Sequence, residues 1–226
     1  MNLRQSKSVL LIFSYVFVMF LLPYVTLYGI SALFNISDPI ALQVYTNLVS
    51  YLVLVAITLL LFGKELLTEL KEIKSTGKYL RAVLVGWIIL WGCSILANLI
   101  VMAITQSEES SVNQQVIEQC MSIYPVLMGI TTVLFAPLVE EVVFRYTIMK
   151  GFLNRPWIGI ALSSFLFGMI HVISAGDFIY IIQYMAMGIA LGYTYYRHQN
   201  IWYSIGVHAV QNFISTVLVF ITLFLT

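Results

Sequence analysis

Six polar side chains whose types could do chemistry lie inside three long apolar runs of this chain. They are Glu140, Glu141 and Arg145 in the first run, His171 in the second, and His208 and Asn212 in the third. A charge at the centre of a bilayer costs at least ~2.5–3.5 kcal/mol on insertion scales. If these runs cross a membrane, we expect the six groups to face one another or a wet cavity, which is typical of a functional site.

The three charges of the first run are not equivalent. Glu141 and Arg145 are separated by four residues, so a helix would place them one turn apart on one face as an ion pair. Glu140 is rotated by about 100° from Glu141 and cannot share that partner equally. We therefore predict that Glu140 faces the cavity as a general base, with a structural polar contact in the helix bundle as the alternative. Glu141 and Arg145 are predicted to support it.

The histidines and the amide lie at depths that overlap with Glu140. At about 1.5 Å per residue from the basic end of each span, Glu140 lies about 15 Å deep, His208 about 16 Å, Asn212 about 22 Å and His171 about 22–24 Å. Phe167 precedes His171 by one turn. A lone histidine in a membrane helix is often an interhelical hydrogen-bonding residue. Together, however, these groups are expected to line one cavity.

Glu, two His and an amide suit several chemistries. In a hydrolase, Glu140 would take a proton from a water that attacks a peptide carbonyl, while an imidazole and Asn212 stabilise the oxyanion. In a metallohydrolase, His171, His208 and Glu140 would bind zinc and leave one position open, although the common HExxH helix is missing. In a proton-coupled transporter, Glu and His would form a relay, but no duplicated halves are visible. An interaction protein would use the same groups only to hold its helices together.

The composition indicates whether these helices lie in water or in a lipid bilayer. Of 226 residues, 61% are hydrophobic and only 9% are charged, which indicates an integral membrane protein. A net charge of +1 favours no nucleic-acid partner. Spanning segments of this length and continuity are expected to be helices rather than barrel strands. The fold class is therefore predicted to be an all-α integral membrane protein, with residues 1–226 forming one domain.

About seven transmembrane helices are expected. The candidate spans are roughly 8–34 (kinked at Pro23), 41–63, 82–105, 122–150, 157–175, 178–196 and 201–225. The first apolar stretch is longer than the core of a signal peptide, so we interpret it as a retained span. Ten of the eleven Lys and Arg residues lie before the first span or in every second connection. The positive-inside rule then predicts a cytoplasmic N-terminus.

Two connections have a pattern of their own. Residues 64–81 combine apolar residues at helical spacing with basic ones, which fits a helix on an anionic membrane surface or a solvated linker helix. Residues 106–121 are polar and acidic. They are expected to be exposed on the opposite side, where they could cap the mouth of a cavity.

The motifs also resemble those of a known family. Glu-Glu-x-x-x-Arg at 140–145, Phe-x-x-x-His at 167–171 and His-x-x-x-Asn at 208–212 resemble the CPBP intramembrane proteases. This family is also called the Abi or CAAX-protease-like family, and it includes the type II CAAX prenyl endopeptidases. The resemblance covers about residues 123–215.

The resemblance implies a glutamate-type intramembrane endopeptidase that needs no cofactor and acts on a small peptide or a membrane-associated protein. Glu140 and His171 would activate and orient water, and His208 and Asn212 would form the oxyanion site. Glu141, Arg145 and Phe167 would support them. A short chain with few loops looks like a bacterial member in the inner membrane, where relatives are associated with bacteriocin immunity. A catalytically silent scaffold is the alternative, and the sequence indicates neither the substrate nor the oligomeric state.

Overall fold

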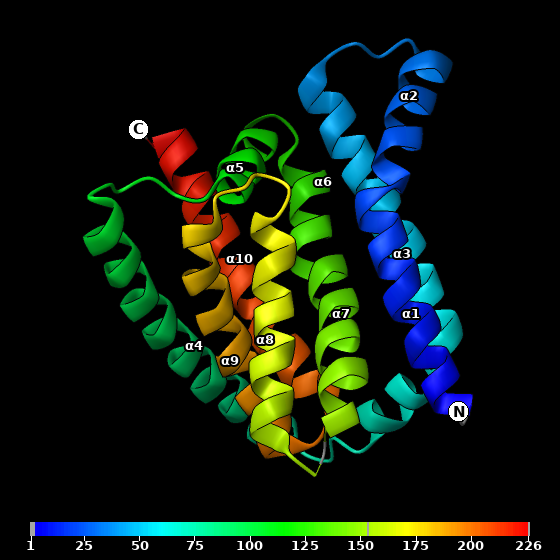
Figure 1. Ribbon diagram of the computed structural model, residues 1–226, viewed down its shortest axis with the longest axis vertical. Coiled ribbons are helices and arrows are strands. Elements are labelled where there is room, and N and C mark those ends of the chain that lie inside the picture. Colours follow the sequence, from blue (N-terminus) through cyan, green and yellow to red (C-terminus); the bar gives the residue numbers. More distant parts are fainter. Residues whose placement is uncertain (1–2, 153, 226) are drawn as a thin grey trace.

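The computed structural model describes residues 3–152 and 154–225, with side chains up to residue 222, and every regular element in this part of the chain is helical (Figure 1). The predicted all-α class is confirmed. The elements are α1 Leu3–Phe20, α2 Leu22–Phe34, α3 Pro39–Lys71, α4 Thr76–Thr105, α5 Val112–Ile123, α6 Pro125–Ile130, η1 Thr131–Phe135, α7 Ala136–Glu141, η2 Val142–Ile148, η3 Met149–Phe152, α8 Pro156–Val172, η4 Phe178–Tyr180, α9 Ile181–His198 and α10 Ile201–Leu225.

Local sequence explains where several helices begin and end. The predicted kink at Pro23 is a break at Leu21, because proline fits the first turn of a new helix but not a helix interior. Asp38 caps α3 by accepting a hydrogen bond from Ala41 N at 2.8 Å. Asn35 ends α2 and Gln199 ends α9, each in the left-handed conformation with a φ of 53°.

Six helical segments in the described part of the chain are long and apolar enough to cross a membrane. They correspond to six of the seven predicted spans. The seventh, predicted at 157–175, is α8, an apolar helix of 17 residues. This helix is slightly shorter than the ~20 residues that usually cross a bilayer. The protein is therefore a multi-pass membrane protein whose shortest predicted span is α8.

The segment from α6 to η3 lies in the middle of the bundle, with α1–α3 on one side and α4, α8, α9 and α10 on the other (Figure 1). In span 125–152, half of the most apolar 18-residue stretch is buried, whereas only 17% of the corresponding stretch of α4 is buried. Many large side chains of α4 are exposed, among them Ile88, Trp91 and Leu96. Because a bilayer solvates apolar surface, α4 forms an outer wall and the motif-bearing span is enclosed by protein.

Polar contacts at one end of α3 connect it to the start of α10. The carboxylate of Glu69 accepts a hydrogen bond from Ile201 N at 2.7 Å, and the Glu69 carbonyl accepts one from Asn200 Nδ2 at 2.6 Å. Trp202 Nε1 donates to Leu66 O at 2.8 Å. These contacts satisfy groups at the first turn of α10 and hold α3 beside the span that carries His208.

The two polar connections behave differently from each other. The predicted helix over 64–81 does not form as a separate element, because α3 continues to Lys71 and α4 begins at Thr76. Residues 106–121 contain α5, which lies across one end of the bundle (Figure 1). This is the segment that, from its sequence, could cap the mouth of a cavity.

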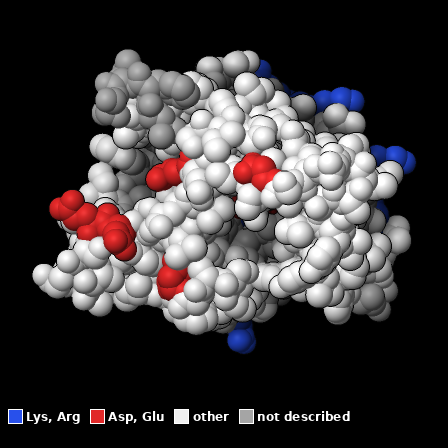
Figure 2. All heavy atoms as spheres, turned by 90° about the horizontal axis from the view of Figure 1, so that it is seen from above, with Lys and Arg blue, Asp and Glu red and all other residues white. Residues whose placement is uncertain are grey.

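The charges are divided between the two ends of the molecule. The end near α5 carries acidic side chains around a hollow and shows almost no basic ones, which appear only at the edges of the view (Figure 2). Asp177 accepts a hydrogen bond from Val112 N at 2.9 Å, and Glu118 accepts one from Gln114 Nε2 at 2.9 Å, so both carboxylates adjoin α5. This division agrees with the charge pattern of the sequence, and the cytoplasmic position of the N-terminus stays a prediction.

Candidate active site

The central span is irregular where it carries the motif. The short helix α7, which includes Glu140 and Glu141, lies between the π-helical segments η1 and η2. A π-helical turn widens the ring of backbone hydrogen bonds and is frequent at functional sites. Every residue of α7 except Leu138 is buried, so its two carboxylates lie inside the protein.

Glu141 and Arg145 form the predicted ion pair. Arg145 Nη1 donates to Glu141 Oε1 at 3.1 Å, and neither side chain is exposed. Arg145 Nη2 also donates to Gly188 O at 3.0 Å, and the guanidinium lies 4.7 Å from the centre of the Phe167 ring. The pair therefore fastens the central span to α8 and α9, as expected of supporting groups.

His208 is held by Glu141. Its Nδ1–H donates to Glu141 Oε1 at 2.9 Å, and Ser204 Oγ donates to the other oxygen of the same carboxylate. Because Nδ1 is engaged in this way, Nε2 is the nitrogen left for chemistry. This atom lies 3.9 Å from Glu140 Oε2, too far for a direct hydrogen bond but close enough for one water molecule to contact both groups.

Glu140 has a partner that the sequence did not indicate. Tyr51, on α3, donates its hydroxyl to Glu140 Oε1 at 2.7 Å. As predicted, Glu140 is free of the Arg145 pair, and its hydrogen-bond partner comes from another helix rather than from its own. Since Tyr51 engages one carboxylate oxygen and His208 faces the other, the orientation of Glu140 is fixed by two different helices.

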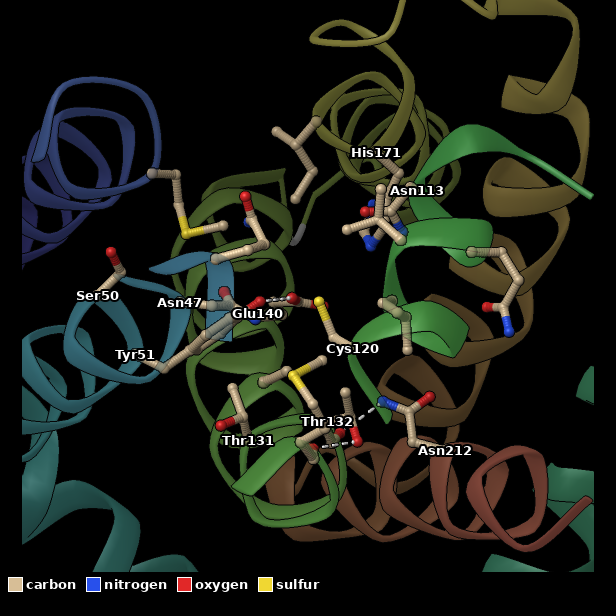
Figure 3. Close-up of a pocket in the computed structure, with 18 of the residues that line it drawn as sticks. Asn47, Ser50, Tyr51, Asn113, Cys120, Thr131, Thr132, Glu140, His171 and Asn212 are labelled. Carbon is tan, nitrogen blue, oxygen red and sulfur yellow. Dashed lines mark hydrogen bonds between the residues drawn. The ribbon is translucent and has the colours of Figure 1, made fainter. Parts of the chain in front are cut away.

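His171 and Asn212 are also oriented by neighbours. The Nδ1–H of His171 donates to Phe167 O at 2.7 Å, and its ring stacks on Tyr184 with centroids 4.4 Å apart. Asn212 Nδ2 donates to Thr132 O at 2.8 Å (Figure 3). The Nε2 atom of His171 and the second N–H of Asn212 therefore stay available. Phe167 packs between His171 and Arg145.

All four candidate catalytic residues line one cavity of about 560 Å³ (Figure 3): Glu140, His171, His208 and Asn212. Residues of α1, α2, α3 and α5 complete its wall, so the amino-terminal half encloses the groups that the carboxy-terminal half presents. The described wall includes no Lys or Arg side chain. Burial raises the pKa of the Cys120 thiol in this wall, which keeps it protonated and disfavours a thiolate nucleophile.

The described residues contain no group of three His, Cys, Asp or Glu side chains with a geometry that would hold a metal ion. The zinc set considered from the sequence, His171, His208 and Glu140, is therefore not assembled as a ligand group in this structure.

Sequence reasoning missed five contributors to the site: Tyr51, Ser204, Tyr184 and the carbonyls of Thr132 and Gly188. Ser204 lies one helical turn before His208, and that spacing is a signal that could have been used. A polar stripe formed by Gln43, Asn47 and Ser50 follows one face of the third helix and lines the cavity. This stripe could have indicated that α3 faces the site, although not that Tyr51 contacts Glu140.

Comparison with known proteins agrees with the motifs. Residues 122–214 match the family model "Type II CAAX prenyl endopeptidase Rce1-like". This match confirms, for residues 122–214, the resemblance recognised from the three motifs, and we call this part of the chain the Rce1-like domain. A membrane protease is the activity that this class of domain indicates.

Individual relatives share only parts of their length with this chain. An uncharacterised protein of Mycoplasma capricolum subsp. capricolum is 36% identical over 46% of this chain and 30% of its own length. "Putative membrane peptidase YdiL" of Bacillus subtilis is 31% identical over 45% of this chain and 41% of its own. The UPF0177 protein YvdC of Lactococcus lactis is 26% identical over 60% of this chain and 51% of its own length. The chain thus spans about half or less of these relatives, and no solved structure matches it significantly.

Proposed function

We propose that this protein is an intramembrane endopeptidase of the bacterial cell membrane that hydrolyses a peptide bond with a water activated by Glu140. One observation carries the proposal. Glu140, His171, His208 and Asn212 belong to the Rce1-like domain and line a single cavity, although they come from three separate helices. A pocket with a few convergent polar groups is the usual form of an active site.

The charges around Glu140 suit a base beside an acid. Two carboxylates and one guanidinium give Glu140, Glu141 and Arg145 a net charge of −1. One proton shared between Glu140 and His208 makes the cluster neutral, and a buried cluster favours neutrality. In this mechanism His208 carries the proton on Nε2 while Glu140 accepts one from the water that adds to the carbonyl, so the imidazolium faces the oxyanion as it forms. When the C–N bond then breaks, Glu140 returns its proton to the leaving amine.

His171 and Asn212 take complementary roles. The free Nε2 of His171 accepts a hydrogen bond from the attacking water and orients it. The second amide N–H of Asn212 donates to the oxyanion together with His208. Thr132 and Phe167 hold the two side chains through backbone carbonyls, so their orientation does not depend on the substrate.

The cavity wall favours an internal segment of a peptide. A free terminal carboxylate inside a low-dielectric cavity needs a cation. The described wall offers no Lys or Arg side chain, and the charge proposed for His208 is already balanced within the neutral cluster. The wall is instead lined with amides and hydroxyls, among them Gln43, Asn47 and Thr131, which pair with the peptide backbone. We therefore infer that the substrate is a small peptide or a membrane-protein segment cleaved away from its charged terminus.

Comparative peptidomics tests the proposal and identifies the substrate. Host cells that express the wild-type protein are compared with cells that express Glu140→Gln at equal levels. We expect peptides that end at a common cleavage site only in the wild-type sample. Identical peptidomes would support a catalytically silent scaffold or immunity protein instead.

Removal of metal ions separates this mechanism from the zinc alternative. Because the base and the oxyanion site are provided by side chains, we expect cleavage to be unchanged after dialysis of the purified protein against a chelator. Elemental analysis of the same sample accompanies the assay. A stoichiometric metal whose removal abolishes cleavage, and whose return restores it, would replace the glutamate mechanism.

A further inference from the structure

A second hollow lies at the basic end of the molecule, between α4 and α9. Its volume is about 350 Å³, and it shares no described residue with the wall of the active-site cavity. The helix α4, which forms one side of this hollow, lies at the edge of the bundle (Figure 1). We call the hollow the α4–α9 groove; its wall includes Lys78 and Arg81 from α4 and Arg197 and His198 from α9.

No described residue neutralises the cations of the α4–α9 groove. Its described wall has no Asp or Glu side chain, and Lys78, Arg81 and Arg197 form no ion pair with any described residue. Three like charges that converge on one hollow repel one another and together create a positive potential. The ligand that this potential selects is an anion with several acceptor oxygens, such as a phosphate.

The wall changes character toward the middle of the span. Val85 and Ile89 follow Arg81 at one and two helical turns on the same face of α4, and both line the groove. Their side chains are 49% and 40% exposed, and Tyr193 on the facing helix is 39% exposed. A cationic site that continues into an exposed apolar stripe matches an amphiphile: an anionic headgroup with a hydrocarbon chain attached.

The floor of the groove is closely packed. A Cβ atom at Gly86 would lie 3.2 Å from Thr194 Oγ1 and 2.7 Å from Val207 Cγ2, so glycine is what allows α4 to approach its neighbours this closely. The stack of the His198 and Tyr203 rings, with centroids 4.3 Å apart, holds the end of α9 against α10. The cations therefore project from helices whose spacing is set by close packing.

We propose that the α4–α9 groove binds an anionic phospholipid, with Lys78, Arg81 and Arg197 around the headgroup phosphate and an acyl chain along Val85 and Ile89. Basic pockets between transmembrane helices are suited to such headgroups. The proposal does not rest on the peptidase activity, because the described wall of the groove contains no candidate catalytic residue.

Native mass spectrometry of the full-length protein, purified in detergent, tests the site. The protein is titrated with dioleoylphosphatidylglycerol and with dioleoylphosphatidylcholine, and the dissociation constant of the first bound lipid is measured. The variant Lys78→Gln/Arg81→Gln/Arg197→Gln is compared with Lys64→Gln/Lys71→Gln/Lys74→Gln, which removes three exposed charges from the same end but outside the groove. We expect the groove variant to bind phosphatidylglycerol about tenfold or more weakly, and the control variant to bind it as the wild type does.

Three further measurements check that the variants fold and that the bound ligand is a lipid. Circular dichroism and size exclusion check that each variant folds, and Arg81→Gln/Arg197→Gln replaces the triple variant if it does not. Equal binding losses in the groove and control variants, or no preference for phosphatidylglycerol over phosphatidylcholine, would overturn the site. Displacement of the lipid by inorganic phosphate at the same concentration would show that a soluble anion, not a lipid, is the occupant.

Discussion

The Rce1-like domain and the amino-terminal helices α1–α3 contribute to the same cavity in different ways. The domain provides every residue of the three motifs and the buried cluster of Glu141, Arg145 and His208. The amino-terminal helices provide the opposite wall and a hydroxyl, that of Tyr51, to Glu140. The difference teaches that the reactive groups are concentrated in one half, while their enclosure and part of their orientation come from the other.

The largest effect is expected from the carboxylate that faces the cavity. Glu140→Gln keeps the size of the side chain and removes the base, so cleavage of the substrate identified by peptidomics should fall by about 10³-fold or more. Glu118→Gln is the control, because that carboxylate lies on α5 and outside the described cavity wall. Normal turnover by the Glu140 variant would show that Glu140 is not the general base.

Arg145→Ala tests the supporting cluster inside the domain. The change leaves Glu141 buried with only His208 and Ser204 as partners, and breaking a buried pair costs about 3–5 kcal/mol. We expect a clearly lower melting temperature in detergent and less protein in the membrane. Arg155→Ala, at an exposed arginine, should melt as the wild type does; equal melting temperatures of the two variants would contradict the supporting role.

His208→Ala tests the proposed oxyanion site. Loss of an oxyanion donor costs about 10²–10³-fold in kcat, and Glu141 keeps Arg145 and Ser204 as partners, so the variant should fold. His198→Ala removes a histidine at the exposed end of α9 and should cleave at the wild-type rate. If His208→Ala changes only KM, the imidazole binds substrate rather than stabilising the transition state.

Tyr51→Phe tests the contribution of the amino-terminal half. It removes one hydrogen bond to a charged group, worth about 1.5 kcal/mol, so kcat should fall about tenfold while KM stays unchanged. Tyr45→Phe on the same helix is the control, because that ring packs on Tyr124 and lies outside the described cavity wall. Equal kcat values for the two variants would show that α3 encloses the cavity but does not contribute to catalysis through the Tyr51 hydroxyl.

Much of the fold follows from local patterns. Apolar runs of about 20 residues in a chain with 9% charge predict membrane helices, and Pro23 and Asp38 mark helix boundaries where the structure has them. The prediction of a separate helix over 64–81, either on the membrane surface or as a solvated linker, was wrong, because its apolar and basic spacing extends α3 and α4 equally well. Short-range periodicity identifies a helix, but it does not say whether two helical stretches join.

Part of the candidate site could likewise be predicted from local sequence patterns, and part could not. Four-residue spacing was enough to predict the pair of Glu141 and Arg145, because both residues lie on one helix. Depth along each span was enough to bring His171, His208 and Asn212 near Glu140. The contact of Tyr51 with Glu140 spans 89 positions in the chain. No periodicity reaches across that separation.

The sequence by itself determined that this chain is a helical membrane protein, that it carries the three motifs of a protease family, and which groups have the depth to meet. Tertiary structure alone decided that His208 is held by Glu141, that Glu140 has a hydroxyl partner on α3, and that α5 helps to enclose the cavity. The physical reason is the range of the interactions. Hydrophobic periodicity and ion pairs at four residues are properties of one helix, whereas orientation at the site depends on how several helices pack.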